Sequence, residues 1–117
     1  MTFNIRRSTP IDAGAVLALL RSLRDESLNV LPRRASLPSL SDEEQWLMRH
    51  DGHQSVVFVA EHEGQVIGLI DVSCLQPKEL SGNGEFGLSV HRDFRQRGVA
   101  KQLIAAAESW AVSKGLR

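Results

Sequence analysis

The stretch "SVHRDFRQRGVAKQL", residues 89–103, changes character at Gly98. The strand-like run "EFGLSV", residues 85–90, leads into it, and apolar residues at helical spacing then predict a helix over residues 98–114, before Gly115. A helix that begins just after a strand offers unpaired backbone N–H groups and a partial positive charge, which together bind anions. Without a Cβ, Gly98 lets a ligand approach the main chain. Four cationic side chains flank it: Arg92, Arg95, Arg97 and Lys101.

The ligand that this pattern predicts is a pyrophosphate. The charged groups of Arg95, Arg97 and Lys101 can neutralise phosphates that the backbone alone would hold weakly. The G-x-G-x-x-G pattern does not directly follow the first predicted strand, and G-x-x-x-x-G-K-[ST] does not occur in the sequence. Dinucleotide-binding and P-loop interpretations therefore lose their main support.

The N-terminal part predicts a strand followed by a helix. Apolar and polar residues alternate over residues 3–9, which indicates a short strand. Thr9 can cap a helix that has Pro10 at its first position and Asp12 in its first turn. This helix is amphipathic and about four turns long, with an apolar stripe at positions i, i+3, i+4 and i+7: Val16, Leu19, Leu20 and Leu23.

The middle of the chain predicts a loop, a helix and a hairpin. Residues 29–40 contain two prolines and no clean period, which is typical of a loop. Ser41 and Glu44 match a capping box and predict a second, shorter helix over residues 41–50. Two β-branched runs on either side of "HEGQ" predict a hairpin over residues 55–75 whose strands are both largely buried.

Length and composition limit the possible classes of protein. The 117 residues predict a single domain, residues 1–117, with one core. The 14 basic and 14 acidic residues balance, so charge gives no general affinity for nucleic acid or membrane. The single Cys74 excludes an internal disulfide, the start of the chain has no signal-peptide pattern, and no apolar run is long enough to span a membrane. We expect a cytoplasmic protein.

The pattern Arg95-x-x-Gly98-x-Ala100 after a strand resembles the acetyl-CoA signature [Q/R]-x-x-G-x-[G/A] of the GCN5-related N-acetyltransferase (GNAT) superfamily. The predicted order, β-α-α-β-β-β-α, is similar to the N-terminal two-thirds of that family's fold. The resemblance implies an α/β (α+β) fold with a mixed, mostly antiparallel sheet flanked by helices. It also implies an N-acetyltransferase that moves an acetyl group from acetyl-CoA to a primary amine of a small molecule or protein, with no metal.

Carried over by position, the resemblance implies a set of site residues. Ser89 and Val90 would meet the pantetheine and thioester through the backbone, and an amide at or near Val90 would polarise the thioester carbonyl. Arg95 opens the signature. The pyrophosphate would lie on the main-chain amides of Gln96, Arg97, Gly98, Val99, Ala100 and Lys101.

A carboxylate must deprotonate the acceptor amine, directly or through water. Glu85, at the start of the predicted fourth strand, is the first candidate for this base. Asp71 and Glu26 are weaker candidates, and Glu26 could also attract a cationic amine substrate. The sequence leaves the acceptor open among aminoglycosides, amino acids, polyamines and protein amines.

The sequence also departs from the family pattern. In the family, the helix matching residues 98–114 leads into further strands and a helix that often supplies a tyrosine general acid, whereas this chain has no tyrosine. Cys74 and Ser73 could donate the proton to the thiolate, but small core residues are the simpler interpretation. The strand over residues 85–90 is expected to be an open edge, and Trp110 to lose part of its cover. We therefore expect a C-terminally truncated GNAT domain: a shortened form of a longer acetyltransferase, a deletion product, or a subunit completed by a partner or by self-association, of which a homodimer is the plainest.

Two alternatives to catalysis remain at this stage. The chain could be a non-catalytic or remnant coenzyme A-binding module, or "HRDFRQR" could contact nucleic acid, although the neutral charge and scarce aromatics disfavour the latter. The histidines have no ligand-like partners and predict no metal site: His50, His53, His62 and His91. Three acidic residues are assigned only to favourable placement at a helix N-terminus: Asp42, Glu43 and Glu44.

Overall fold

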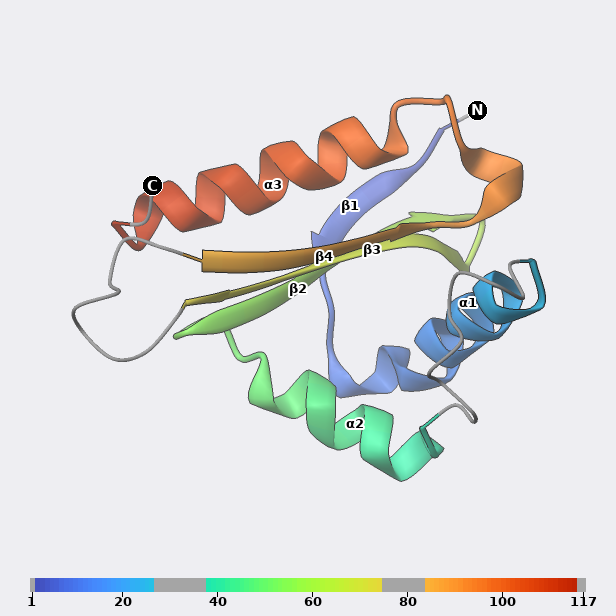
Figure 1. Ribbon diagram of the computed structural model, residues 1–117, viewed down its shortest axis with the longest axis horizontal. Coiled ribbons are helices and arrows are strands. Elements are labelled where there is room, and N and C mark those ends of the chain that lie inside the picture. The colour runs from blue at the N-terminus through green and yellow to red at the C-terminus, as the bar shows by residue number, and fades with distance from the viewer. Residues whose placement is uncertain (1, 27–37, 75–83, 116–117) are drawn as a thin grey trace.

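The computed structural model describes residues 2–26, 38–74 and 84–115, and the elements follow the predicted order (Figure 1). Two short 3-10 turns, η1 and η3, precede α1 and α3. The elements are β1 (Asn4–Arg7), η1 (Pro10–Asp12), α1 (Ala13–Glu26), α2 (Leu40–Arg49), β2 (Ser55–His62), β3 (Gln65–Cys74), β4 (Gly84–Val90), η3 (Arg92–Phe94) and α3 (Val99–Ser113).

The four strands form one sheet in the order β1-β2-β3-β4, and each neighbouring pair is antiparallel. Within the described residues every strand pair is thus antiparallel, in agreement with the mostly antiparallel sheet that was predicted. The β2–β3 hairpin turns at Glu63 and Gly64, which both have positive φ (51° and 81°), as tight two-residue turns require. β4 is an edge of this sheet, as expected.

Helices cover both faces of the sheet: α3 lies on one, and α1 and α2 lie on the other (Figure 1). Each face has its own apolar core, so successive residues of β2 are buried on opposite sides, such as Val56 under α3 and Val57 under α1 and α2. Burial on both faces explains why the hairpin strands read as continuous apolar runs. Leu103, which is fully buried, anchors α3 to its face.

The start of the first helix is confirmed, with a tight first turn. Asp12 is buried and accepts hydrogen bonds from the Thr9 amide (2.8 Å) and from Arg6 Nη1 and Nη2 (2.9 and 2.8 Å). Arg6 Nε also donates to Glu61 at 3.0 Å, which ties β1 to β2 and η1. The Arg6 guanidinium holds the pKa of the Asp12 carboxyl below its ordinary value.

The predicted capping box at Ser41 and Glu44 is wrong. α2 begins at Leu40, and Ser39 is its N-cap, with a side-chain oxygen that accepts from the Asp42 amide at 3.0 Å. Ser39 and Ser41 are each followed three residues later by an acidic residue, Asp42 and Glu44, so the sequence pattern allows either serine as the N-cap.

The expected loss of cover at Trp110 is also wrong. The indole is 8% exposed and its Nε1 donates to the Gly52 carbonyl at 3.3 Å. The loop before β2 therefore closes over this end of α3.

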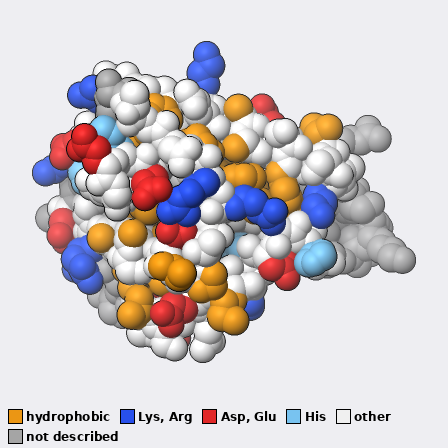
Figure 2. All heavy atoms as spheres, turned by 180° about the vertical axis from the view of Figure 1, so that it is seen from behind, with side chains coloured by type: hydrophobic (Ala, Val, Ile, Leu, Met, Phe, Trp, Pro, Cys, Tyr) orange, Lys and Arg blue, Asp and Glu red, His pale blue; other side chains and the backbone are white. Residues whose placement is uncertain are grey.

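The surface has no single dominant charge in the view from behind, where acidic and basic side chains are interspersed (Figure 2). Among the described residues, no helix is long and apolar enough to cross a bilayer.

Candidate active site

The connection from β4 to α3 ends in backbone amides that have no partner within the helix. Gly98 is the N-cap of α3 and adopts the left-handed conformation, with φ of 86°. The first intrahelical bond runs from the Gln102 amide to the Gly98 carbonyl at 3.1 Å, so the amides of residues 98–101 have no partner within the helix. Val99 is buried and fixes this end of α3 against the sheet, whereas Arg97, Gly98 and Lys101 are exposed. A Cβ on Gly98 would meet no atom within 4 Å, so backbone conformation, not crowding, requires the glycine.

The loop that carries these amides is fixed to the sheet. Arg95 Nε donates to the Val90 carbonyl at 3.0 Å, and the His91 amide donates to the Ile67 carbonyl at 2.8 Å. The Phe94 ring lies 5.5 Å from the rings of both His62 and His91, measured between centroids. Arg95, which the sequence assigned to phosphate binding, therefore also holds the loop in place.

The hydrogen-bond ladder decides which β4 amides are accessible. In an antiparallel pair, residues that exchange hydrogen bonds with the partner alternate with residues whose N–H and C=O point away. The His91–Ile67 bond continues the β3–β4 register, which pairs Leu69 with Ser89 and Gly68 with Val90. The Ser89 amide therefore points to β3, whereas the Val90 amide points to the open edge. The Phe86 and Leu88 amides point to that edge as well.

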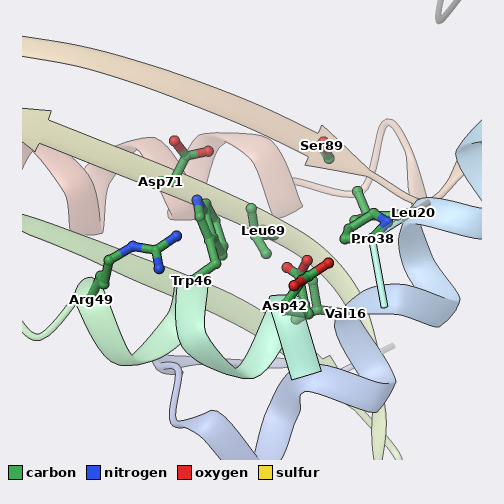
Figure 3. Close-up of a pocket in the computed structure, with 10 residues that line it drawn as sticks. Val16, Leu20, Pro38, Asp42, Trp46, Arg49, Leu69, Asp71 and Ser89 are labelled. Carbon is green, nitrogen blue, oxygen red and sulfur yellow. The ribbon is translucent and has the colours of Figure 1, made fainter. Parts of the chain in front are cut away.

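A cavity of about 410 Å³ lies on the face of the sheet that α1 and α2 cover, between the sheet and these two helices (Figure 3). The Trp46 indole extends from α2 toward β3, with the Arg49 side chain beside it (Figure 3). The lining is apolar at the α1 end and carries three carboxylates against one guanidinium: Val16, Leu20, Pro38, Asp42, Glu43, Trp46, Arg49, Leu69, Asp71 and Ser89.

Asp71 occupies a space that a glycine leaves open. It pairs with Gly87 across the strands, and a Cβ on Gly87 would lie 2.7 Å from Asp71 Oδ1. The carboxylate is half-buried, and burial raises the pKa of this group above its ordinary value, partly offset by the nearby His50. Within the described residues, no other residue forms a hydrogen bond or ion pair with the Asp71 side chain, and a hydrogen bond from Asp71's own amide also lowers the pKa of the carboxyl.

Comparison with known proteins identifies the family. The model of the acetyltransferase (GNAT) family matches residues 18–117. The chain belongs to the GNAT family. This confirms the resemblance drawn from the β4–α3 stretch and supports the assignment to N-acetyltransferases.

The relatives agree with this family. Over 66 residues, the chain is 41% identical to aminoglycoside N(6')-acetyltransferase type 1 of Salmonella typhimurium; the match covers 51% of this chain and 45% of the relative. The chain thus spans about half the length of the curated relatives that it matches.

Solved structures share the fold. A GNAT acetyltransferase from Streptococcus pneumoniae superposes with a TM-score of 0.88 at 22% identity, covering 99% of this chain and 71% of that chain. An aminoglycoside acetyltransferase from an uncultured soil metagenomic sample, in complex with sisomicin, gives 0.73 at 21% identity, covering 98% and 73%. At these identities the likeness shows the GNAT fold alone.

The GNAT fold brings some predicted site residues together and separates others. The amides of residues 96–101 and Val90 lie at one end of β4. Glu85 lies near the opposite end, paired with Ser73, and Glu26 is the last residue of α1; the side chains of both lie outside the described residues. Ser89 contributes to the cavity lining, while its amide faces β3.

Four residues of α2 line the cavity although the sequence predicted none of them as site residues: Asp42, Glu43, Trp46 and Arg49. Glu43 is only 5% exposed, although it was assigned to the helix N-terminus alone. Its position four residues before the buried Leu47 places it on the inward stripe of α2, and this spacing could have identified it. Among the described residues, no group of three or more His, Cys, Asp or Glu lies close enough to hold a metal ion.

Proposed function

We propose that this protein is an acetyl-CoA-dependent N-acetyltransferase whose acceptor is a primary amine of an aminoglycoside. The observation that carries the proposal is the arrangement at the end of β4. The unpaired amides of residues 98–101 and the outward amide of Val90 lie on one side of this strand end. The carboxylate-bearing cavity, which Ser89 reaches, lies on the other.

The donor would bind along the open edge of β4. Its pyrophosphate would accept hydrogen bonds from the amides opening α3, with Arg97 and Lys101 exposed beside them to neutralise charge. The thioester carbonyl would accept from the Val90 amide, which points away from β3. A fixed donor aimed at a developing oxyanion contributes about 3 kcal/mol to catalysis in comparable sites.

The acceptor would enter the cavity. Among the described residues of its lining, the carboxylates of Asp42 and Asp71 outnumber the guanidinium of Arg49, so this part of the cavity favours cationic molecules. Aminoglycosides carry several ammonium groups, and the apolar wall beside Trp46 suits the flat faces of sugar rings. The 41% identity to an aminoglycoside N(6')-acetyltransferase supports the same acceptor class.

The test is a turnover assay with separate donor-binding and acceptor arms. The purified protein is incubated with acetyl-CoA and, separately, with aminoglycosides including sisomicin, a polyamine, free amino acids and a peptide with a free N-terminus. Released thiol and product mass are recorded, and acetyl-CoA binding is measured by calorimetry. We expect acetylated aminoglycoside as the main product.

Each other outcome contradicts a defined part of the proposal. Turnover only on the peptide or polyamine would overturn the acceptor class. Calorimetric binding of acetyl-CoA without turnover on any amine would favour the coenzyme A-binding module that the sequence left open. Absence of binding heat for acetyl-CoA would overturn the donor site.

A further inference from the structure

Two carboxylates, Asp71 of β3 and Glu85 of β4, are candidates for the base, and they lie at different distances from the Val90 amide. Gly87, which lies opposite Asp71, precedes Val90 by three residues, and Glu85 precedes it by five. At about 3.4 Å per residue, the backbone beside Asp71 is about 10 Å from the amide expected to hold the thioester, and that of Glu85 about 17 Å. One bridging water can close the shorter gap once a substrate amine lies between them, but not the longer one.

The surroundings of Asp71 fit proton transfer better than a structural role. Gly87 leaves room for the carboxylate above β4, since any side chain there would collide with Asp71 Oδ1. Among the described residues, Asp71's own backbone amide is the hydrogen-bonding partner of the carboxylate, and no other residue forms a hydrogen bond or an ion pair with it. It lines the same cavity as Ser89, the neighbour of Val90. A carboxylate in a cavity that no described cationic side chain ion-pairs with is a place for a cation to bind.

We propose that Asp71 receives the reacting ammonium of the acceptor and takes its proton through a bridging water. This inference rests on the proposed function. The freed amine nitrogen forms a C–N bond with the thioester carbonyl carbon, and the C–S bond then breaks. The second proton on that nitrogen leaves with the departing sulfur, so the products are the amide and the coenzyme A thiol. The proton on Asp71 returns to solvent.

The charges around Asp71 set the expected pH dependence. The titratable or charged groups that face it among the described residues belong to α2 or its C-cap: Asp42, Glu43, Arg49 and His50. Burial raises the pKa of Asp71, and a positive charge on His50 lowers it. Because the base acts only when ionised, kcat/KM falls as the pH drops through this raised pKa. It falls again at high pH, where the acceptor is no longer an ammonium ion.

The experiment compares three variants of the full protein with sisomicin as the probe. Asp71→Asn keeps the shape and removes the base, and Gly87→Ala displaces the carboxylate without removing it. Glu108→Gln, exposed on α3 and outside the cavity, is the control for the change in net charge. Measurements are the pH profile of kcat/KM, sisomicin affinity and acetyl-CoA affinity by calorimetry, and circular dichroism to verify folding.

We expect Asp71→Asn to lower kcat/KM by about 100-fold or more and to abolish the acidic limb of the pH profile. Sisomicin binding should weaken about tenfold, while acetyl-CoA binding and the Glu108→Gln profile stay at wild-type values. Gly87→Ala should give an intermediate loss. If wild-type protein acetylates sisomicin and Asp71→Asn keeps its rate and acidic limb, the inference is overturned and the proposed function stands. If wild-type protein neither binds nor acetylates sisomicin, both are overturned together.

Discussion

Substitution of Gly98 by alanine tests whether backbone conformation at the start of α3 is what binds the donor. Gly98 has φ of 86°, and a Cβ there would meet nothing within 4 Å. The substitution therefore adds no collision, only the strain of an L-residue in the left-handed region, about 1–2 kcal/mol. Gly64, in the β2–β3 turn, has φ of 81° and equally open surroundings. Gly64→Ala is thus a matched control for the strain, at a turn that reaches the proposed donor loop through the contact of His62 with Phe94 but contributes none of its amides.

The strain should lower the unfolding free energy in Gly64→Ala and the affinity for acetyl-CoA in Gly98→Ala. The β2–β3 hairpin fixes the conformation at residue 64, so Gly64→Ala should lose about 1–2 kcal/mol of unfolding free energy, with a Tm about 4–8 °C lower per kcal/mol. Residues 96–98 are exposed and follow the part of the loop that Phe94 and Arg95 fix to the sheet, so they can relax when residue 98 leaves the left-handed region. Binding of acetyl-CoA must then restore the strained conformation. A penalty of 1–2 kcal/mol corresponds to a Kd raised about 5–30-fold.

The assay is calorimetric titration with acetyl-CoA together with thermal unfolding of both variants. We expect Gly98→Ala to raise the Kd by about 5–30-fold with a small loss of Tm. Gly64→Ala should lower the Tm and keep the wild-type Kd. Equal Kd values in both variants would refute the argument that the amides opening α3 hold the donor.

Three further predictions concern charge and association. Burial raises the pKa of Asp71 in the folded state, so between the unfolded and folded pKa values the native protein binds more protons than the unfolded chain, and its stability falls as the pH rises through that range. Asp71→Asn should therefore unfold at a higher urea concentration than wild type at pH 7, but not at a pH below the unfolded pKa near 3.8. Arg6 lowers the pKa of Asp12, so this ion pair stabilises the fold above the unfolded pKa, and the stabilisation is lost as the pH falls through the pKa of the folded state. Asp12→Asn should be less stable than wild type at pH 7 and show a shallower acid transition. An unchanged acid transition would contradict this. We also predict that light scattering detects a homodimer and that acetyl-CoA dissociates it, because pairing of two β4 strands would occupy the outward Val90 amide. A dimer that binds acetyl-CoA with undiminished affinity would exclude pairing through that edge.

The parts of the fold that could be predicted carry local signals. The helix start at Gly98 is visible because a left-handed backbone selects glycine and the apolar stripe of α3 follows at once. The hairpin is visible because a turn at Glu63 and Gly64 separates two β-branched runs. In these cases the residues that form the structure are neighbours in the chain, so a short stretch of sequence is sufficient to predict it.

The parts that could not be predicted depend on contacts between distant segments. The cover over Trp110 comes from Gly52, 58 residues away. The cavity depends on how α2 packs over β3, and α2 itself begins two residues earlier than the alternative cap at Ser41 predicts. The Asp71–Gly87 pairing depends on the β3–β4 register. Where both faces of a sheet are buried, hydrophobic alternation does not specify that register.

The β3–β4 register joins the two halves of the proposed site in one strand. The side chains of Ser89 and Asp71 share a face of the sheet, toward the cavity, and Gly87 leaves that face open beside Asp71, while the amide of Val90 points to the open edge. Acceptor and donor can therefore approach β4 from different directions and meet near its end. A slip of one residue would place Leu88 or Phe86 opposite Asp71 and would turn the Val90 amide into the ladder with β3. Both the space for the base and the oxyanion donor would be lost in the same step, so in this sheet the register of one strand pair determines whether acetyl transfer is geometrically possible.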